Sequence, residues 1–161
     1  ELFFLKPVKV IIGKDFFSGP GLYLSSNKFC KVELGSSIMF GPEVMLLGGN
    51  HDYRFAGSHL RYHAEHDGNS KKIIVGNGAW VGARTIILSG AEIGEGAIIG
   101  SGALVNKKIP AYCIAVGNPA KPIAVRFKDI KDLKCILENV SSELNIIDVN
   151  RLLPKNLKYE I

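Results

Sequence analysis

Histidines and other ring-bearing residues gather in the middle of this 161-residue chain, where the string HDYRF starts at His51. An imidazole titrates near neutral pH, so a histidine held in place here could take a proton from a substrate as a general base. A histidine at the start of a loop is also often only a polar surface residue. The residue type alone leaves both interpretations open.

Metal binding is a second chemistry open to this region. His59, His63 and His66 are spaced by four and three residues and would share one face of a helical turn. A metal ion also needs ligands held rigidly in a fixed geometry, and nothing near them in the sequence supplies that. We therefore expect no metal site, and these histidines are assigned to an acceptor pocket instead.

The elements that must position His51 are indicated by a six-residue period. From Val75 to Pro110 the sequence divides into the hexads VGNGAW, VGARTI, ILSGAE, IGEGAI, IGSGAL and VNKKIP. Each hexad begins with an aliphatic residue, and its fifth residue is small in all but the last. Neither a helix nor an alternating strand has this period, whereas a prism with three flat walls does. The predicted fold class is therefore an all-β solenoid, a parallel β-helix whose coils bury their faces by stacking.

The same phase occurs earlier in the chain, on the other side of an interruption. Leu34, Phe40 and Leu46 begin the hexads LGSSIM, FGPEVM and LLGGNH, so His51 directly follows an ordered repeat. Residues 52–72 contain no hexads and are rich in polar and ring-bearing residues. A solenoid can extrude such a loop from one face without losing its stacking, and long loops in compact proteins are usually functional or disordered.

Past Pro110 the hexads fade, and apolar residues recur at helical spacing. This predicts an amphipathic helix at about 129–140, packed on the solenoid, where it would help to cover the edge of the last coil. We therefore expect a β-helix domain at 1–120 with the loop at 52–72, and a C-terminal helical extension at 121–161.

Composition excludes several classes of protein. The hydrophobic content is 47%, and the formal charge of +5 is spread along the chain without a basic, aromatic-rich cluster for nucleic acid. No apolar run of about 20 residues and no signal-peptide pattern is found, although the start inside an apolar stretch is consistent with further residues upstream. An odd number of cysteines without a CxxC pair suits a reducing compartment. We expect a cytoplasmic protein with no membrane span and no nucleic-acid partner.

A family resemblance rests on the string NGAWVGARTIILSGAEIGEGAIIGSGALVNKKIPAYCIAVGNPAKPI, preceded by GGNHDYRF. Together they resemble the hexapeptide-repeat acyltransferases, which have a left-handed β-helix. Within this family the chain is most similar to the O-acetyltransferases of bacterial surface polysaccharides and to xenobiotic and galactoside acetyltransferases. The resemblance covers residues 10–127. It implies a homotrimer that binds acetyl-CoA, without a metal, along the groove between neighbouring prisms.

The resemblance also implies roles for individual residues. In the family the histidine matching His51 takes the proton from the acceptor hydroxyl, and the tryptophan matching Trp80 lies beside the active site. Gly82 and Ala83 stand where the family's backbone approaches the thioester, and the amide of Ala83 is the favoured oxyanion donor. Trp80 could instead be a structural cover for a corner of the prism, but the interpretation adopted is a wall at the reactive end of the site. The residues assigned to acceptor binding are Asn50, Tyr53, Arg54, Arg61 and Tyr62.

Coenzyme contacts are expected on the later coils, because small residues there would expose strand edges to the narrow pantetheine chain. Asn106 and Lys107 match a Thr-Lys pair of the galactoside enzymes, with an amide in place of the hydroxyl. Lys121 and Arg126 would meet the coenzyme phosphates, or they are solvated surface charges. The full set assigned to the coenzyme is Ala83, Ser101, Gly102, Ala103, Asn106, Lys107, Lys121 and Arg126.

The predicted activity is O-acetyl transfer from acetyl-CoA to a hydroxyl of a sugar or surface-polysaccharide precursor. Direct attack in a ternary complex is expected, because Cys30 and Cys113 are predicted to be internal or remote and no other residue is placed to carry the acetyl group. A galactoside-type acceptor is less expected, since residues 21–23 lack the asparagine of those enzymes. The alternatives are a xenobiotic O-acetyltransferase, an amino-sugar N-acetyltransferase and a non-catalytic scaffold.

Overall fold

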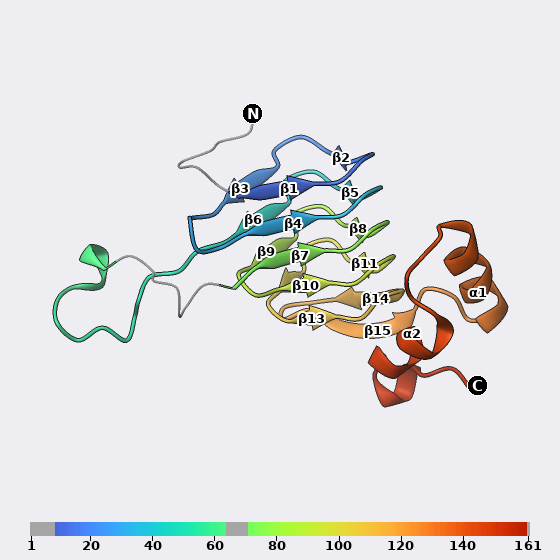
Figure 1. The fold of residues 1–161 in the computed structure, drawn as a ribbon. Coiled ribbons are helices and arrows are strands. Elements are labelled where there is room, and N and C mark those ends of the chain that lie inside the picture. The colour runs from blue at the N-terminus through green and yellow to red at the C-terminus, as the bar shows by residue number, and fades with distance from the viewer. Residues whose placement is uncertain (1–8, 64–70, 161) are drawn as a thin grey trace.

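The computed structural model describes residues 9–63 and 71–160. Within these ranges the strands form three sheets, here called A, B and C, and the chain visits them in turn (Figure 1). Sheet A contains β1 (Val10–Ile12), β4 (Val32–Leu34), β7 (Ile73–Val75), β10 (Glu92–Ile93) and β13 (Lys108–Ile109). Sheet B contains β2 (Phe17–Ser18), β5 (Met39–Phe40), β8 (Trp80–Val81), β11 (Ile98–Ile99), β14 (Cys113–Val116) and β15 (Lys121–Val125). Sheet C contains β3 (Tyr23–Ser25), β6 (Met45–Leu47), β9 (Ile86–Leu88) and β12 (Leu104–Val105).

Strands of successive coils pair in parallel and in register. Met39 lies opposite Trp80, for example, and Trp80 lies opposite Ile98. The turns between the sheets form three corners, which we name the A–B, B–C and C–A corners after the sheets they join. These parallel sheets fit the parallel β-helix predicted from the hexads and the left-handed form implied by the family resemblance.

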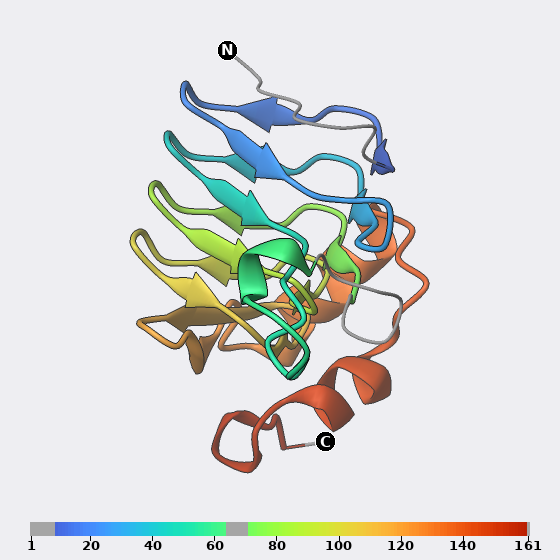
Figure 2. The same cartoon turned by 90° about the vertical axis from the view of Figure 1, so that its left-hand side faces the viewer.

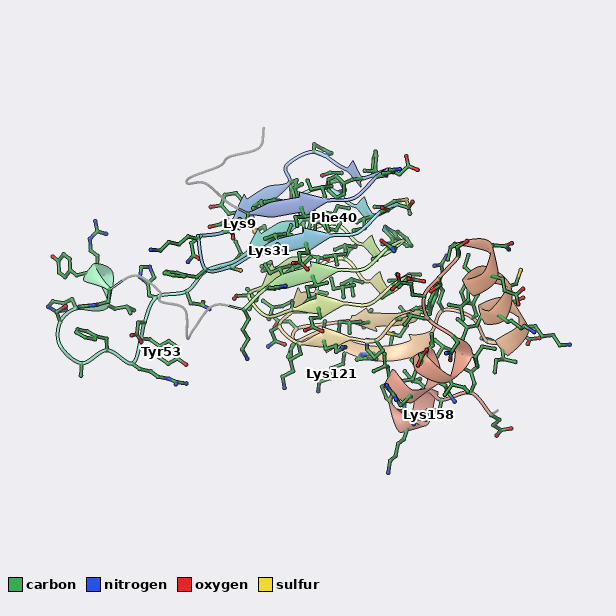
Figure 3. All side chains as sticks on the ribbon, viewed as in Figure 1. Lys9, Lys31, Phe40, Tyr53, Lys121 and Lys158 are labelled. Atoms are coloured by element: carbon green, nitrogen blue, oxygen red, sulfur yellow. The ribbon has the colours of Figure 1, made fainter. Side chains whose placement is uncertain are left out.

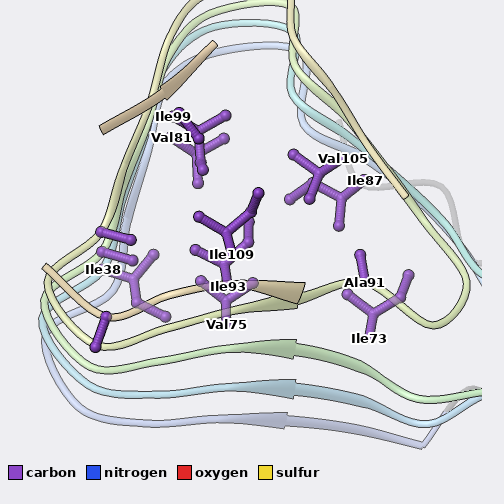
Figure 4. Close-up of a cluster of buried hydrophobic side chains, with 14 of the residues drawn as sticks. Ile38, Ile73, Val75, Val81, Ile87, Ala91, Ile93, Ile99, Val105 and Ile109 are labelled. Carbon is purple, nitrogen blue, oxygen red and sulfur yellow. The ribbon is translucent and has the colours of Figure 1, made fainter. Parts of the chain in front are cut away.

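The core lies between the three walls and is made by the first residue of each hexad. Figure 4 shows Val75 and Ile93 on one wall, Val81 and Ile99 on a second, and Ile87 on the third. All of them are buried, and burying one aliphatic side chain contributes about 1.5–3 kcal/mol. The small fifth residues are buried at the turns: Ala79, Thr85, Ala91, Ala97 and Ala103. The hexad interpretation is confirmed.

The predicted loop leaves the solenoid at the C–A corner, between β6 and β7 (Figures 1 and 2). Its described part contains a short 3-10 helix, η1 (Leu60–Tyr62), while residues 64–70 lie outside the described ranges.

The C-terminal extension begins with a strand and continues with helices. β15 pairs antiparallel with β14, so it covers one edge of sheet B. α1 (Ile130–Asn139) confirms the predicted helix; Asp129 caps it by accepting a hydrogen bond from Lys131 N, and Leu133 and Leu137 are buried. α2 (Ile146–Leu152) and η2 (Lys155–Leu157) follow. Among the described residues, no helix is long and apolar enough to cross a bilayer.

The three thiols should differ sharply in reactivity. Cys135 is exposed on α1, whereas Cys30 and Cys113 are buried. Burial raises the pKa of the Cys113 thiol to about 12, so this thiol stays protonated at neutral pH. We expect DTNB to modify Cys135 rapidly in the folded protein and the other two only after unfolding in urea. A rapid reaction that persists in Cys135→Ser would contradict this burial.

Candidate functional site

The B–C corner brings the chain of one coil unusually close to the next. A β-carbon on Gly41 would lie 2.6 Å from Ala83 N, and one on Gly82 would lie 2.6 Å from Ser101 N. Only glycine fits at these two positions. Ser101 and Gly102 are exposed directly below Gly82 and Ala83, so the corner forms a surface of small residues running from coil to coil. Four of the residues assigned to the coenzyme, Ala83, Ser101, Gly102 and the buried Ala103, lie at this corner.

The two predicted backbone donors differ in availability. Gly82 N–H already donates to Ile99 O at 2.8 Å, whereas Ala83 N–H donates no hydrogen bond within residues 9–63 and 71–160. The buried hydroxyl of Thr85 donates to Gly82 O at 2.8 Å and steadies the turn. Of the two N–H groups, that of Ala83 is the one available to donate a hydrogen bond to an oxygen on which negative charge develops.

Trp80 lies on sheet B with its side chain facing outward. It is 48% exposed, and its register neighbours Met39 and Phe17 are 51% and 62% exposed. The outer face of sheet B is therefore an apolar row that the described residues of one copy leave open to solvent.

His51 lies at the C–A corner, where the loop begins. Its Nδ1 is 3.1 Å from the carbonyl oxygen of His63. A carbonyl oxygen can only accept a hydrogen bond, so Nδ1 carries the proton and Nε2 of the neutral ring is left as an acceptor. In this tautomer Nε2 is the basic nitrogen of the ring. Arg61, Tyr62 and Leu60 line an open hollow together with His51.

The residues around His63 hold this carbonyl in place. Ser58 Oγ lies 2.6 Å from His63 Nε2, and the Phe55 ring stacks on the imidazole with its centroid 3.7 Å away. Sequence reasoning placed His63 in the acceptor pocket and missed its main-chain contact with His51. No sequence signal identifies such a contact, because any residue type supplies a carbonyl.

Three of the predicted acceptor residues, Asn50, Tyr53 and Arg54, are not among those that line this hollow. The guanidinium of Arg54 lies over the Tyr53 ring at 5.5 Å from its centroid, and both residues are exposed. Figure 3 shows Tyr53 on the loop, well away from Lys121 at the bottom of the solenoid. Asn50 precedes His51 at the same corner and is exposed.

One copy of the chain does not bring all the predicted site residues together. Asn106 and Lys107 lie at the C–A corner below the loop, and Lys121 begins β15. Arg126 lies at the A–B corner, where its Nη1 donates to Gly96 O at 3.4 Å. Sheet C separates His51 from Ala83, so in one copy the predicted base and the predicted oxyanion donor stand at different corners.

Metal ligands do not gather in the part of the chain that the structure describes. Within it, no three His, Cys, Asp or Glu side chains are grouped so that they could hold an ion. His66, one of the three histidines considered for a metal, lies outside the described residues.

Comparisons with known proteins give one consistent relationship. Residues 72–107 match the family described as bacterial transferase hexapeptide (six repeats). The polysialic acid O-acetyltransferase of Escherichia coli O1:K1 is 38% identical over 121 residues, which are 73% of this chain and 37% of that protein. The galactoside O-acetyltransferase of Lactococcus lactis is 32% identical over 115 residues, which are 66% of this chain and 51% of that protein.

A solved structure shares the fold over a similar range. The crystal structure of a maltose O-acetyltransferase from Clostridium difficile 630 has a TM-score of 0.61 and 27% identity, and the match covers 75% of this chain and 60% of that one. The chain thus spans about half or less of the length of the two curated relatives.

The close approach at the B–C corner can be tested with a pair of glycine substitutions. Gly82→Ala places a methyl group against the main-chain atoms Ser101 N and Ile99 O, which cannot move aside as a side chain can, so its cost lies at or above the top of the usual range of about 1–3 kcal/mol for overpacking. Gly102→Ala meets open space, and its φ of 71° costs only about 1–2 kcal/mol. We expect a larger drop in the urea midpoint for Gly82→Ala; the reverse order would contradict the close approach.

Proposed function

The chain is related to the hexapeptide-repeat acetyltransferases, as its sequence indicated, and we propose that it transfers an acetyl group from acetyl-CoA to a hydroxyl of a sugar or surface-polysaccharide precursor. The observation that carries this proposal is the hydrogen bond from His51 Nδ1 to the His63 carbonyl. It leaves Nε2 free to accept a proton at the edge of a hollow lined by Arg61 and Tyr62. The named activities of the two curated relatives, on polysialic acid and on galactosides, support a saccharide acceptor.

The residues would divide the reaction between them as follows. His51 Nε2 takes the proton of the acceptor hydroxyl, and the oxygen forms a bond to the thioester carbonyl carbon. Ala83 N–H donates to the carbonyl oxygen as negative charge develops on it. The C–S bond then breaks, and the protonated His51 returns its proton to the departing thiolate. Cys30 and Cys113 are buried, which supports direct transfer without an acetylated cysteine.

The separation of His51 from Ala83 supports a site shared between copies of the chain. In the homotrimer that we propose, the C–A corner of one copy lies beside the B–C corner of the next. The apolar outer row of sheet B, which includes Phe17, Met39 and Trp80, would be covered in such an assembly. We place the coenzyme in this groove, with its pantetheine arm along Ala83, Ser101 and Gly102. The exposed free thiol of Cys135 supports a reducing, cytoplasmic setting.

Coenzyme binding and the role of His51 can be separated by thermal melting. Acetyl-CoA at a hundred times its Kd should stabilise the protein by about 2.7 kcal/mol. We expect the same upward shift in Tm for the wild type and for His51→Ala, together with loss of acetyl transfer in the variant, because His51 acts on the acceptor. If acetyl-CoA raises the Tm of neither protein, acetyl-CoA is not the acetyl donor. If only His51→Ala fails to shift, His51 belongs to coenzyme binding.

The oxyanion role of Ala83 can be tested with Ala83→Pro, which removes the amide hydrogen. Pro20 and Pro42 already occupy the equivalent turn position in the two coils above, so the fold should accept proline here. We expect an unchanged Tm and a kcat lower by about 10²–10³-fold, with Ala83→Ser as a control that keeps the N–H. A folded Ala83→Pro enzyme with wild-type kcat would exclude this donor.

A further inference from the structure

Three lysines lie directly in line on the outer face of the solenoid. Lys9, Lys31 and Lys72 each stand one residue before a strand of sheet A, namely β1, β4 and β7. Val32 N donates to Lys9 O at 3.0 Å, and Ile73 N donates to Lys31 O at 2.9 Å, so the three are matched from coil to coil. Figure 3 shows Lys9 above Lys31 at the end of sheet A where the loop leaves. We call Lys9, Lys31 and Lys72 the lysine column.

This arrangement is unfavourable for folding by itself. Neighbouring strands of a sheet lie about 4.8 Å apart, and like charges directly opposite one another are destabilising. A single carboxylate offsets part of the repulsion: Glu33 lies 2.7 Å from Lys31 Nζ and 3.1 Å from Lys72 Nζ. These two hydrogen bonds lower the pKa of Glu33. Three lysines against one glutamate leave a net charge of about +2 on the column.

The lysine column lies at the corner from which the loop that carries His51 leaves the solenoid. Lys72 ends the returning arm of the loop, at the same C–A corner from which His51 starts it. Lys71 adds a lysine next to Lys72 and lies against the next coil, since its N–H donates to Ser89 Oγ at 3.2 Å. Arg61 adds a cation at the hollow beside His51. Positive charge thus gathers at the corner that also carries the predicted base.

We propose that the lysine column binds an acidic polysaccharide, a polymer with a carboxylate on its sugar units, and leads one of those units to His51. The second half of this proposal rests on the acetyltransferase function proposed above. Double-stranded DNA carries one negative charge per about 1.7 Å of its helix axis, a much denser line of charge than lysines about 4.8 Å apart can match, so the column suits a more sparsely charged polymer. The column also offers point charges without aromatic rings between them, whereas single-stranded nucleic acid is usually bound on aromatic stacking platforms.

Binding is tested without acetyl-CoA, using fluorescently labelled polygalacturonate and neutral dextran of similar length. We expect the wild type to bind polygalacturonate at low salt, more weakly at high salt, and to ignore dextran. The triple variant Lys9→Gln, Lys31→Gln, Lys72→Gln should bind about tenfold more weakly, while Glu33→Gln should bind more tightly because it frees two lysines. A matched control, Lys128→Gln, Lys155→Gln, Lys158→Gln, makes the same change in net charge on the C-terminal extension.

Several results would overturn the proposal. The control variant with three substitutions on the C-terminal extension could weaken binding as much as the triple variant of the lysine column. Binding would then depend on the net charge of the protein and not on the column. A single-stranded oligonucleotide could bind more tightly than polygalacturonate, which would point to nucleic acid. The column triple could lose the Tm shift with acetyl-CoA, which would assign these lysines to the coenzyme. The binding assay involves no acetyl transfer. Loss of polygalacturonate binding with acetyl transfer intact would therefore refute only the role of the lysine column. A protein that binds no acetyl-CoA would refute the proposed function, and its binding of polygalacturonate could still be measured.

Discussion

The parallel hydrogen bonds that join each coil to the next are the constraint on which the rest of this structure depends. They hold Met39, Trp80 and Ile98 in one row and the aliphatic residues of the hexads in another, facing inward. A slip of one residue would turn the inward row outward, so the buried face fixes the register. Once the register is set, residues far apart in the sequence become neighbours, and each corner becomes a vertical series of equivalent positions.

Equivalent positions at one corner are occupied by different residue types in successive coils. At the B–C corner the residue after the glycine is Pro20, Pro42, Ala83 and then Ser101 as the coils descend. A proline cannot donate a main-chain hydrogen bond, so the amides start to be available only below the level of the loop. The C–A corner carries the loop and the lysine column, while the A–B corner holds the contact of Arg126 with Gly96. The three corners are thus specialised although the three walls are alike.

The parts of the structure that could be predicted from the sequence are those that follow a regular repeat. The hexads identified the inward residues, and helical spacing located α1 to within a residue, because both are local patterns. A period of six on three walls also implies that residues 18 apart, such as Ala83 and Ser101, are stacked. The irregular loop interrupts this count, so the position of His51 relative to Ala83 could not be derived. The contact of His51 with the His63 carbonyl was equally out of reach, because main-chain partners have no sequence signature. β15 was not anticipated either, since an antiparallel strand follows no hexad.

The strand β15 also makes the two ends of the solenoid unequal. At the C-terminal end it covers sheet B, and Leu133 and Leu137 of α1 are buried. In the first described coil, by contrast, Ile12 is 50% exposed, although its register partners Leu34 and Val75 are buried. Each coil of a solenoid is stabilised only by contacts with the coils next to it. Such a structure therefore unfolds locally from its less stable end, one coil at a time. Within residues 9–63 and 71–160, amide exchange would then slow from the coil of Ile12 toward that of Cys113. On warming, the upper part of the solenoid would become mobile while the small-residue surface at Ala83 and Ser101 is still intact.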